Sequence, residues 1–320
     1  MTIRARVRSV VRKLMIEFNN WKLTLRLLAC VWLSTIVKAP DVRLVLLCAF
    51  STSWRLFCVH GGGHRYFSHK SYSVPAWFEL LMAYTISCTE LNQLAYWTTL
   101  HNSHHAHCED EEDFHSPVRK GFWKVQLTFN LLNEKELDKV SKMLDSPAAK
   151  KKSSTYYKND LSRISLPISI LALVLDNVGF LLLGYIVPDW TSLCVWYYLS
   201  LIPRFYTTMA ANLTNSAGHR FGTRPYIMKG SRADCFATNC WWAAVLGGGE
   251  GWHNNHHMFA LSARHGFYWY EIDTIFWMLC ILGKLGIVTN MLVVSDAVKS
   301  APADTDFSLF ERKYDTWFKA

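Results

Sequence analysis

Three clusters of histidine constrain this 320-residue chain more than any other feature. The segment Gly251–His257 ends in three histidines with the spacing HxxHH, and the same spacing recurs at His101–His105. On an α-helix, residues i, i+3 and i+4 share a face, so each cluster directs two or three imidazoles toward one point. A single HxxHH would be a set of surface or core histidines roughly half of the time. Three clusters that hold eight of the 13 histidines predict a metal site.

The remaining cluster, His64–His69, comes first in the chain and has its two histidines five residues apart. On an α-helix this spacing is a rotation of about 140°, at about 3.6 residues per turn. The pair therefore either straddles one site or serves two metals, and the spacing alone leaves both open.

Several segments are apolar over about the length that a membrane-spanning helix needs, roughly 20 residues. They are residues 44–60, 166–187 and 190–211, and a shorter segment, 23–37, contains Arg26. Only 18% of the residues are charged. We therefore predict an all-α fold, a four-helix transmembrane bundle with a cytoplasmic helical cap that holds the histidines. Asp176 and Asn177 fall inside one of these helices, and the sequence indicates no role for them.

The net charge of +9 would suit a nucleic-acid partner, but its distribution favours membrane topology. Residues 1–22 are predicted to form a basic amphipathic segment on the cytoplasmic surface, whereas the connection Val187–Trp190 carries no basic residue. By the positive-inside rule the N-terminus is cytoplasmic, although Lys38 and Arg43 soften the contrast. An Arg-rich transit peptide is the alternative. We expect a multi-pass integral membrane protein of the endoplasmic reticulum, a plastid or a bacterial inner membrane, with no nucleic-acid partner.

Two further apolar segments, about 74–97 and 267–288, are interrupted by charged and polar residues. Because such groups are costly inside a bilayer, we predict interfacial helices there. A spanning helix at 74–97 would also place the first two histidine clusters on opposite sides of the membrane. The basic region 119–163 is interpreted as solvated surface. The nine cysteines lack a CxxC pair and are interpreted as reduced, without a disulfide framework.

Imidazole is a ligand for zinc, copper, iron and nickel alike, so the ligand type does not identify the metal. The number of histidines narrows the kind of metal site. The eight clustered histidines and His219 exceed the four ligands of a structural zinc site. They fit two metal ions that each have five or six coordination positions, some of them left open. Two adjacent redox metals could activate O2. No Ser, Cys or Lys nucleophile in a recognisable setting competes for a catalytic role.

The clusters HRxxSH, HxxHH and GEGWHNNHH, with Asn215–His219 before the last of them, resemble those of membrane fatty acyl desaturases of the delta-9 type. The resemblance extends from about residue 40 to about residue 290, so residues 23–320 are expected to form one desaturase domain. The segment Gly249–His257, followed by Ser262–Gly266, is most similar to cyanobacterial and plant members.

This resemblance implies a di-iron enzyme that uses O2 and two electrons to place a cis double bond, at the delta-9 position, in a saturated acyl chain. It implies metal ligands at His64, His69, His101, His104, His105, His219, His253, His256 and His257, and at Asn215 through a water. It implies a substrate tunnel bordered by Thr52, Gly63 and Trp97, where bulk at Thr52 would limit chain length. The sequence carries no recognisable electron-carrier segment, so the donor is expected to be separate: a ferredoxin, or a small b-type cytochrome with its reductase.

Other residues near the clusters are assigned more simply. Carboxylates often orient metal-bound imidazoles, which makes Asp110, Asp113 and Glu250 candidates, although solvated acids are the simpler interpretation of residues 109–113 as a group. The histidines outside the motif are expected to make ordinary polar contacts; they are His60, His107, His115 and His265.

Three departures from the family pattern bear on the substrate. Asn102 stands where relatives usually carry Arg, Thr99 where animal acyl-CoA enzymes carry Arg, and Phe114 where Pro is usual. The loss of two cations weakens the case for a clamp on the phosphates of coenzyme A. An acyl-lipid substrate is therefore favoured, with acyl-CoA as the alternative.

Two alternatives to this function are retained. A lipid hydroxylase, or a desaturase of other regiochemistry, would share the chemistry, because the product depends on where the acyl chain lies relative to the metals. His253 stands where front-end desaturases typically have Gln, which argues against that subclass. From a different class, a histidine-rich metal transporter would carry its ligands within the spanning helices instead of beyond their ends.

Overall fold

The computed structural model describes residues 24–89, 94–114, 116–128, 134–144, 165–228, 235–299, 301, 305 and 313–320. The predicted amphipathic segment 1–22, residues 90–93, His115 and most of the lysine-rich part of 119–163 lie outside these ranges.

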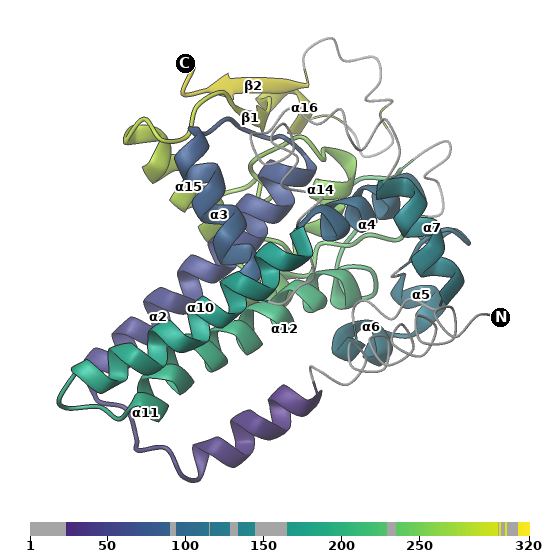
Figure 1. Cartoon of the computed structure of the whole chain (residues 1–320). Helices are drawn as coiled ribbons and strands as arrows, with labels where there is room; N and C mark the ends of the chain where they lie inside the picture. Colours follow the sequence, from purple (N-terminus) through teal and green to yellow (C-terminus); the bar gives the residue numbers. More distant parts are fainter. Residues whose placement is uncertain are drawn as a thin grey trace.

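The fold is organised around long helices that lie side by side (Figure 1). Helix α2 (Val42–Phe57) begins at Asp41, whose side chain accepts a hydrogen bond from the Leu44 amide at 2.9 Å, and continues without a break into η1 (Cys58–Ser68), which is a π-helix. Helix α10 (Ser165–Ile186) turns back at residues 187–191. It is followed by α11 (Ser192–Trp196), η2 (Tyr197–Leu201) and α12 (Ile202–Ala217), which form one continuous helical rod.

Two of these helices are long and apolar enough to cross a membrane, Val42–Ser68 and Ile168–Ile186. The predicted span at 44–60 lies within the first and the span at 166–187 matches the second. The predicted span at 23–37 is a shorter apolar helix, Thr24–Ser34, and the one at 190–211 lies within the rod Ser192–Ala217. The described part of the chain is therefore mostly helical with two candidate membrane helices, which is less than the four predicted.

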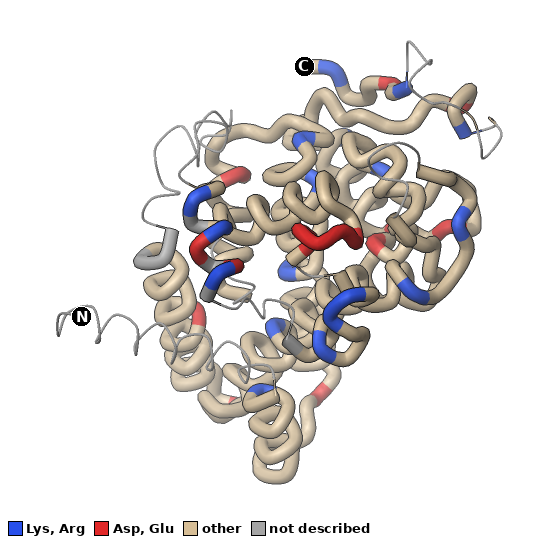
Figure 2. Tube along the Cα trace, turned by 90° about the vertical axis from the view of Figure 1, so that its right-hand side faces the viewer, with Lys and Arg blue, Asp and Glu red and all other residues tan. Residues whose placement is uncertain are grey.

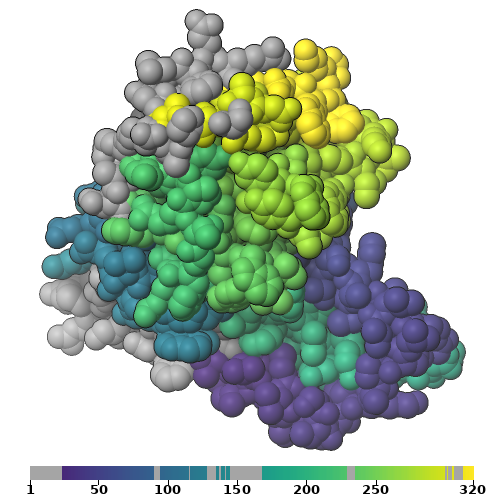
Figure 3. All heavy atoms as spheres, turned by 180° about the vertical axis from the view of Figure 1, so that it is seen from behind, coloured from purple at the N-terminus to yellow at the C-terminus, as the bar shows by residue number. Residues whose placement is uncertain are grey.

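Apolar side chains point outward from these long helices. On α2, Val42, Leu46 and Phe50 recur at i, i+4 and i+8 and are 65–71% exposed. A similar exposed stripe follows α10 and includes Val174, Val178 and Leu182. Figure 2 shows few charges along these helices and more around the opposite end of the molecule, and Figure 3 shows α2 reaching the surface beside the Thr24–Ser34 helix. An outward apolar face of this extent suits a lipid environment.

A buried polar layer crosses the long helices and explains Asp176 and Asn177. Asp176 on α10 forms an ion pair with Arg55 of α2 at 2.5 Å and accepts a hydrogen bond from Ser200 of η2 at 2.7 Å. The side-chain oxygen of Asn177 accepts hydrogen bonds from Arg204 at 2.9 Å and from the Trp196 indole at 2.6 Å. Two adjacent polar residues of one helix thus tie it to both neighbours.

Shorter helices cover the end of the bundle that lies away from the α10–α11 turn (Figure 1). They are α3 (Ala76–Cys88), α4 (Leu94–Ala106), α5 (Pro117–Lys120), α6 (Phe122–Thr128), α7 (Glu134–Leu144), α13 (Trp241–Leu246), α14 (His253–Met258), α15 (Thr274–Lys284) and α16 (Asp296–Lys299). A core of buried apolar residues from η1, α3 and α15, among them Phe67, Met82 and Ile275, supports them.

Both predicted interfacial helices are shorter in the structure. The helix predicted at 74–97 ends at Cys88, where the Thr89 hydroxyl donates to the Ile86 carbonyl at 2.6 Å, and a separate helix, α4, starts at Leu94. The helix predicted at 267–288 is reduced to α15, because the Asp273 side chain caps its first turn at the Phe276 amide and Gly286, with φ of 72°, follows its end.

The prediction of an all-α fold needs one correction. Strand β1 (Met291–Val294) pairs antiparallel with β2 (Tyr314–Trp317), so that Met291 lies opposite Trp317. β1 is buried and combines β-branched residues with Met and Leu, which suits a strand. This small sheet lies outside the three histidine clusters.

Candidate metal centre

The nine histidines that the sequence singled out converge from four separate segments into two adjacent groups. Group 1 contains His64 of η1, His69 directly after it, His101 and His105 of α4, and His256 of α14. Group 2 contains His104 of α4, His219 after α12, and His253 and His257 of α14. Within each group one nitrogen of every ring lies within 4.8 Å of the corresponding nitrogen of the others.

The π-helix resolves the spacing of the first cluster. In a π-helix the hydrogen bond runs from residue i+5 to residue i, and the His69 amide donates to the His64 carbonyl at 3.2 Å. Residues five apart therefore lie near one face, and the two rings are 5.0 Å apart. Both histidines serve the same group, so the rotation of about 140° expected for an α-helix was wrong here.

Glycines allow η1 to approach its neighbours closely. A Cβ atom at Gly61 would lie 3.3 Å from Ile275 on α15, and one at Gly62 would lie 3.1 Å from the sulfur of Met82 on α3. A side chain at either position would be tightly packed, so that either the neighbouring side chain or η1 would have to shift.

The contacts between the rings fit metal ligation. In group 1 the Nε2 atoms of His64 and His256 are 2.9 Å apart, and those of His69 and His101 are 2.7 Å apart. In group 2 the Nε2 atom of His219 lies 3.1 Å from that of His104 and 3.0 Å from that of His253. Two imidazoles at right angles on a metal, with bonds of about 2.1 Å, place their nitrogens about 3 Å apart.

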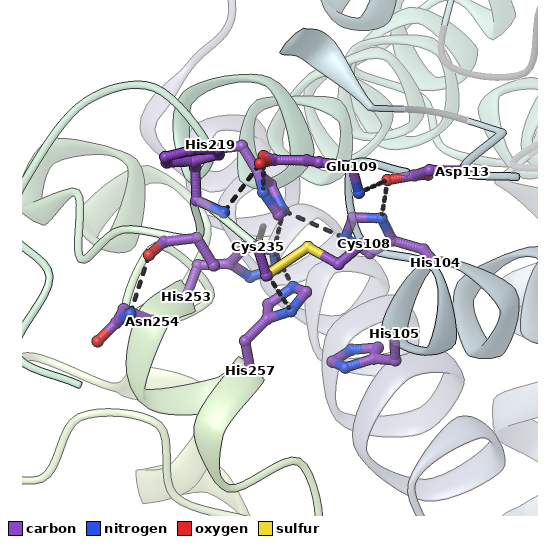
Figure 4. Close-up of a disulfide and its surroundings, with 12 residues drawn as sticks. His104, His105, Cys108, Glu109, Asp113, His219, Cys235, His253, Asn254 and His257 are labelled. Carbon is purple, nitrogen blue, oxygen red and sulfur yellow. Dashed lines mark hydrogen bonds and ion pairs between the residues drawn. A yellow bond between two sulfur atoms is a disulfide. The ribbon is translucent and has the colours of Figure 1, made fainter. Parts of the chain in front are cut away.

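Carboxylates on the far side of the rings set the tautomers. His104 Nδ1 lies 2.8 Å from Asp113 Oδ2, and His219 Nδ1 lies 2.9 Å from Glu109 Oε1 (Figure 4). A carboxylate accepts only, so each Nδ1 carries the proton and each Nε2 keeps a lone pair. The two lone pairs of His104 and His219 then face each other, and a cation between them removes the repulsion. The donor set therefore fits a metal ion.

Glu250 performs the same role in group 1. Its Oε2 contacts His64 Nδ1, and its Oε1 accepts from the guanidinium of Arg65 at 2.8 Å. Arg65 is fully buried and also pairs with Asp273 at 2.9 Å. Burial by itself would raise the pKa of Glu250, but its contacts with His64 and Arg65 outweigh burial and hold that pKa well below its usual range. Glu250 is therefore an anion that orients His64.

The asparagines between the histidines of the third cluster fix α14. Asn254 donates to the carbonyls of Tyr226 and Ala237, each at 2.9 Å, and Asn255 donates to Glu271 at 3.1 Å. Asn239 accepts from the amides of both at 3.0 and 3.2 Å. The pattern HNNHH thus alternates residues that face the metal groups with residues that hold the backbone.

Six of the nine imidazoles favour the neutral form in this environment. Burial lowers the pKa of His69, His105, His219, His253, His256 and His257, and for all of these except His219 the pKa falls well below its usual value. Neutral imidazole is the form that binds a metal.

Asn215 and the acidic residues after α4 are placed as follows. Asn215 is buried on α12 and donates to the Ala211 carbonyl at 3.1 Å. Asp113 and Glu109 are buried, so the interpretation of residues 109–113 as solvated was wrong for these two. Glu109 was missed because its burial depends on residues far away in the sequence. Asp110 contacts His107 at 2.9 Å instead of a metal-group histidine.

The histidines outside the motif differ from one another. His60 contacts the Gly247 carbonyl at 2.8 Å and His107 is partly exposed beside Asp110, so both make the expected polar contacts. His265 is fully buried with its ring 4.5 Å from that of His256, and Glu250 lies 3.6 Å from its Nδ1.

The prediction that the chain lacks disulfides was wrong for one pair. Cys108 and Cys235 are bonded to each other, and their Cα atoms are 5.1 Å apart (Figure 4). They are 127 residues apart in the sequence, and no local spacing marks them as partners. The other seven cysteines are free, as predicted.

Helices with apolar outer faces and a nine-histidine centre at one end are compatible with a membrane-associated protein that binds metal ions. A profile of the fatty acid desaturase family matches residues 41–284. The chain belongs to the fatty acid desaturase family.

Relatives of the chain are also desaturases, and their names refer either to lipids or to acyl-CoA. A probable chloroplastic lipid desaturase of Arabidopsis thaliana is 30% identical over 78% of this chain and 66% of its own length. The sn-1 stearoyl-lipid 9-desaturase of Anabaena variabilis is 32% identical over 72% of this chain and 76% of its own length. The acyl-CoA C20 Delta5-desaturase of Anemone leveillei is 30% identical over 74% of this chain and 69% of its own length.

Proposed function

We propose that this protein is an O2-dependent di-iron desaturase that introduces a cis double bond at the delta-9 position of a saturated acyl chain in a lipid. The observation that carries the proposal is the convergence of nine histidines into two adjacent groups in a chain of the desaturase family. Acyl-CoA is the alternative substrate, since relatives of both kinds match at similar identity.

The proposed iron ligands are the five histidines of group 1 and the four of group 2, with Asn215 acting through a water. Two iron ions held there would supply the redox chemistry that reduces O2 and breaks the C–H bonds. The chain's own residues orient the imidazoles through Glu109, Asp113 and Glu250. Their burial keeps bulk water away from the ligands, which strengthens these charged contacts.

The proposed acyl tunnel borders group 1. Trp97 stacks on His101 with the ring centroids 5.3 Å apart, and a Cβ atom at Gly63 would lie 3.4 Å from the Trp97 ring. The contact between Gly63 and Trp97, next to His101, supports placing both on one wall of the proposed tunnel. Thr52 lies on the same helical stretch, where its hydroxyl donates to the Cys48 carbonyl. A Thr52→Trp variant is expected to shorten the products, and unchanged chain lengths would refute this assignment.

The proposed setting is a membrane that α2–η1 and α10 cross, with residues 23–320 as one domain. The apolar stripes of α2 and α10 support contact with lipid. The histidine groups lie at one end of these helices, which supports chemistry at a membrane surface, on the proposed cytoplasmic side. Electrons would come from a separate ferredoxin or b-type cytochrome.

The test is expression in a host that lacks its own desaturase, followed by location of double bonds in its lipids by mass spectrometry. A double bond at carbon 9 of lipid-bound chains is expected, and hydroxylated chains would instead indicate a lipid hydroxylase. His256→Ala should abolish the product because it removes a ring that lies 2.9 Å from both His64 and His105. His107→Ala is the matched control, because His107 lies at the surface outside both groups.

Metal analysis of the purified protein separates the enzyme from the transporter alternative. We expect about two irons per chain, whereas labile zinc without iron would favour metal transport.

A further inference from the structure

The disulfide Cys108–Cys235 adjoins group 2 and is not explained by the family's histidine pattern. It joins the segment that follows α4 to the segment that precedes α13. Cys108 is 4% exposed and Cys235 is fully buried. Figure 4 shows the bond between the residues that orient His219 and the ring of His257.

The residues next to the two cysteines hold Glu109 in place. Glu109 follows Cys108, and Phe236 follows Cys235. The Phe236 amide donates to Glu109 Oε2 at 2.8 Å, while Glu109 Oε1 holds His219 Nδ1 at 2.9 Å. The covalent bond therefore keeps together the two segments whose contact positions the carboxylate behind His219.

The disulfide also contacts a second ring of the same group directly. Cys235 Sγ lies 3.4 Å from His257 Nδ1. A disulfide sulfur has no hydrogen to donate, so it can only accept from Nδ1–H, which leaves the Nε2 lone pair of His257 for a metal. At His64, His104 and His219 carboxylates occupy the equivalent position.

We propose that Cys108–Cys235 is a redox-breakable positioning cross-link for group 2. A dithiol reductant transfers two electrons and two protons to the pair, so that the S–S bond becomes two thiols and the dithiol becomes a disulfide. The Cys235 thiol then offers a hydrogen to His257 Nδ1 and favours the tautomer whose Nε2 cannot bind a metal. The two segments separate at the same time, and Glu109 loses its fixed contact with Phe236.

Reduction therefore weakens metal binding in group 2 and leaves group 1 intact, since none of the group 1 rings contacts either sulfur in the described residues. On the proposed cytoplasmic side, disulfides are usually transient and redox-sensing, which suits a reversible cross-link. This inference rests on the proposed di-metal function.

The experiment counts thiols and metals in the same full-length protein. Alkylation after unfolding without a reductant should modify seven of the nine cysteines, and all nine after dithiothreitol. The iron-loaded native protein is then treated with a chelator before and after reduction. We expect one of two irons to leave roughly 10- to 100-fold faster after reduction, the size of effect seen when a group that orients a ligand is lost.

Variants that lack the Cys108–Cys235 disulfide test the same effect without a reductant. The double variant Cys108→Ser/Cys235→Ser should release one iron quickly both before and after reduction. The control Cys280→Ser removes a free cysteine of α15 and should release iron as the unmodified protein does. Nine thiols without reduction, or equal iron release from protein with seven and with nine thiols, would overturn the proposal. If the double variant does not fold, the comparison of oxidised and reduced native protein still decides. A chain that binds no metal in either state would contradict the proposed function itself.

Discussion

At the scale of single residues, the groups behind the imidazoles matter as much as the ligands. One oxygen of Glu109 accepts a hydrogen bond from His219, and the other accepts one from the Phe236 amide. Glu109→Gln keeps the shape but can present its amide nitrogen to His219, where an acceptor is needed. We expect a roughly 10- to 100-fold loss of metal affinity or activity, measured by chelator competition and product yield.

The matched control for that substitution is Glu111→Gln, two residues away on the same loop and exposed. Equal losses in both variants would mean that the loop's charge matters and the contact with His219 does not.

A second residue-scale prediction concerns Gly249, which precedes the third histidine cluster. Its φ of 117° is rarely adopted by residues with a side chain, and a Cβ atom there would collide with the Asp273 carboxylate that holds Arg65. Gly249→Ala should cost about 1–3 kcal/mol of stability or more, measured by thermal unfolding in detergent. Gly179→Ala is the control, since nothing lies within 4 Å of its Cβ position, and it should not destabilise the protein.

At the scale of helices, the polar layer across α2, α10 and η2 predicts a large penalty for one substitution. Asp176→Leu leaves Arg55 buried without its partner, which typically costs about 3–5 kcal/mol. Adding Arg55→Met removes the unpaired charge and should recover most of the loss. Thermal unfolding of both variants tests this, and a double variant no more stable than Asp176→Leu would contradict it.

The π-helix η1 shows why helix type, and not only spacing, decides which side chains meet. The sequence Gly61-Gly-Gly followed by two histidines five apart was compatible with one metal or two. The i+5 to i hydrogen bond and the close packing against α3 and α15 place both rings in group 1. Spacing arguments that assume an α-helix fail at such a site.

At the scale of the whole molecule, the metals should stabilise the fold, because nine buried imidazoles from four segments are drawn together. A ligand that binds only the folded chain adds about 2.7 kcal/mol when its free concentration is 100-fold above Kd. Iron(II) should raise the melting temperature of metal-free protein, and Mg²⁺, which prefers oxygen ligands, should not. His256→Ala should reduce the iron-dependent rise, and an equal rise in that variant would argue against binding at these groups.

The sequence by itself determined that histidines would present shared faces, that long apolar helices would form, and that the chain resembles desaturases. These features depend on residues within a few turns of one another, where helical geometry is fixed by the backbone. It also offered Asp113 and Glu250 as carboxylates that could orient imidazoles, because both lie close to the clusters, but it offered Asp110 equally and favoured solvated acids for residues 109–113.

Only the tertiary structure decided how the ligands are divided. The neighbours His104 and His105 join different groups, because successive side chains of α4 point about 100° apart and α14 reaches across to both. The burial of Glu109, the pairing of Cys108 with Cys235 and the ion pair of Asp176 with Arg55 depend on segments from 110 to 127 residues apart. Contacts at that separation arise from the packing of whole elements, which no local pattern encodes.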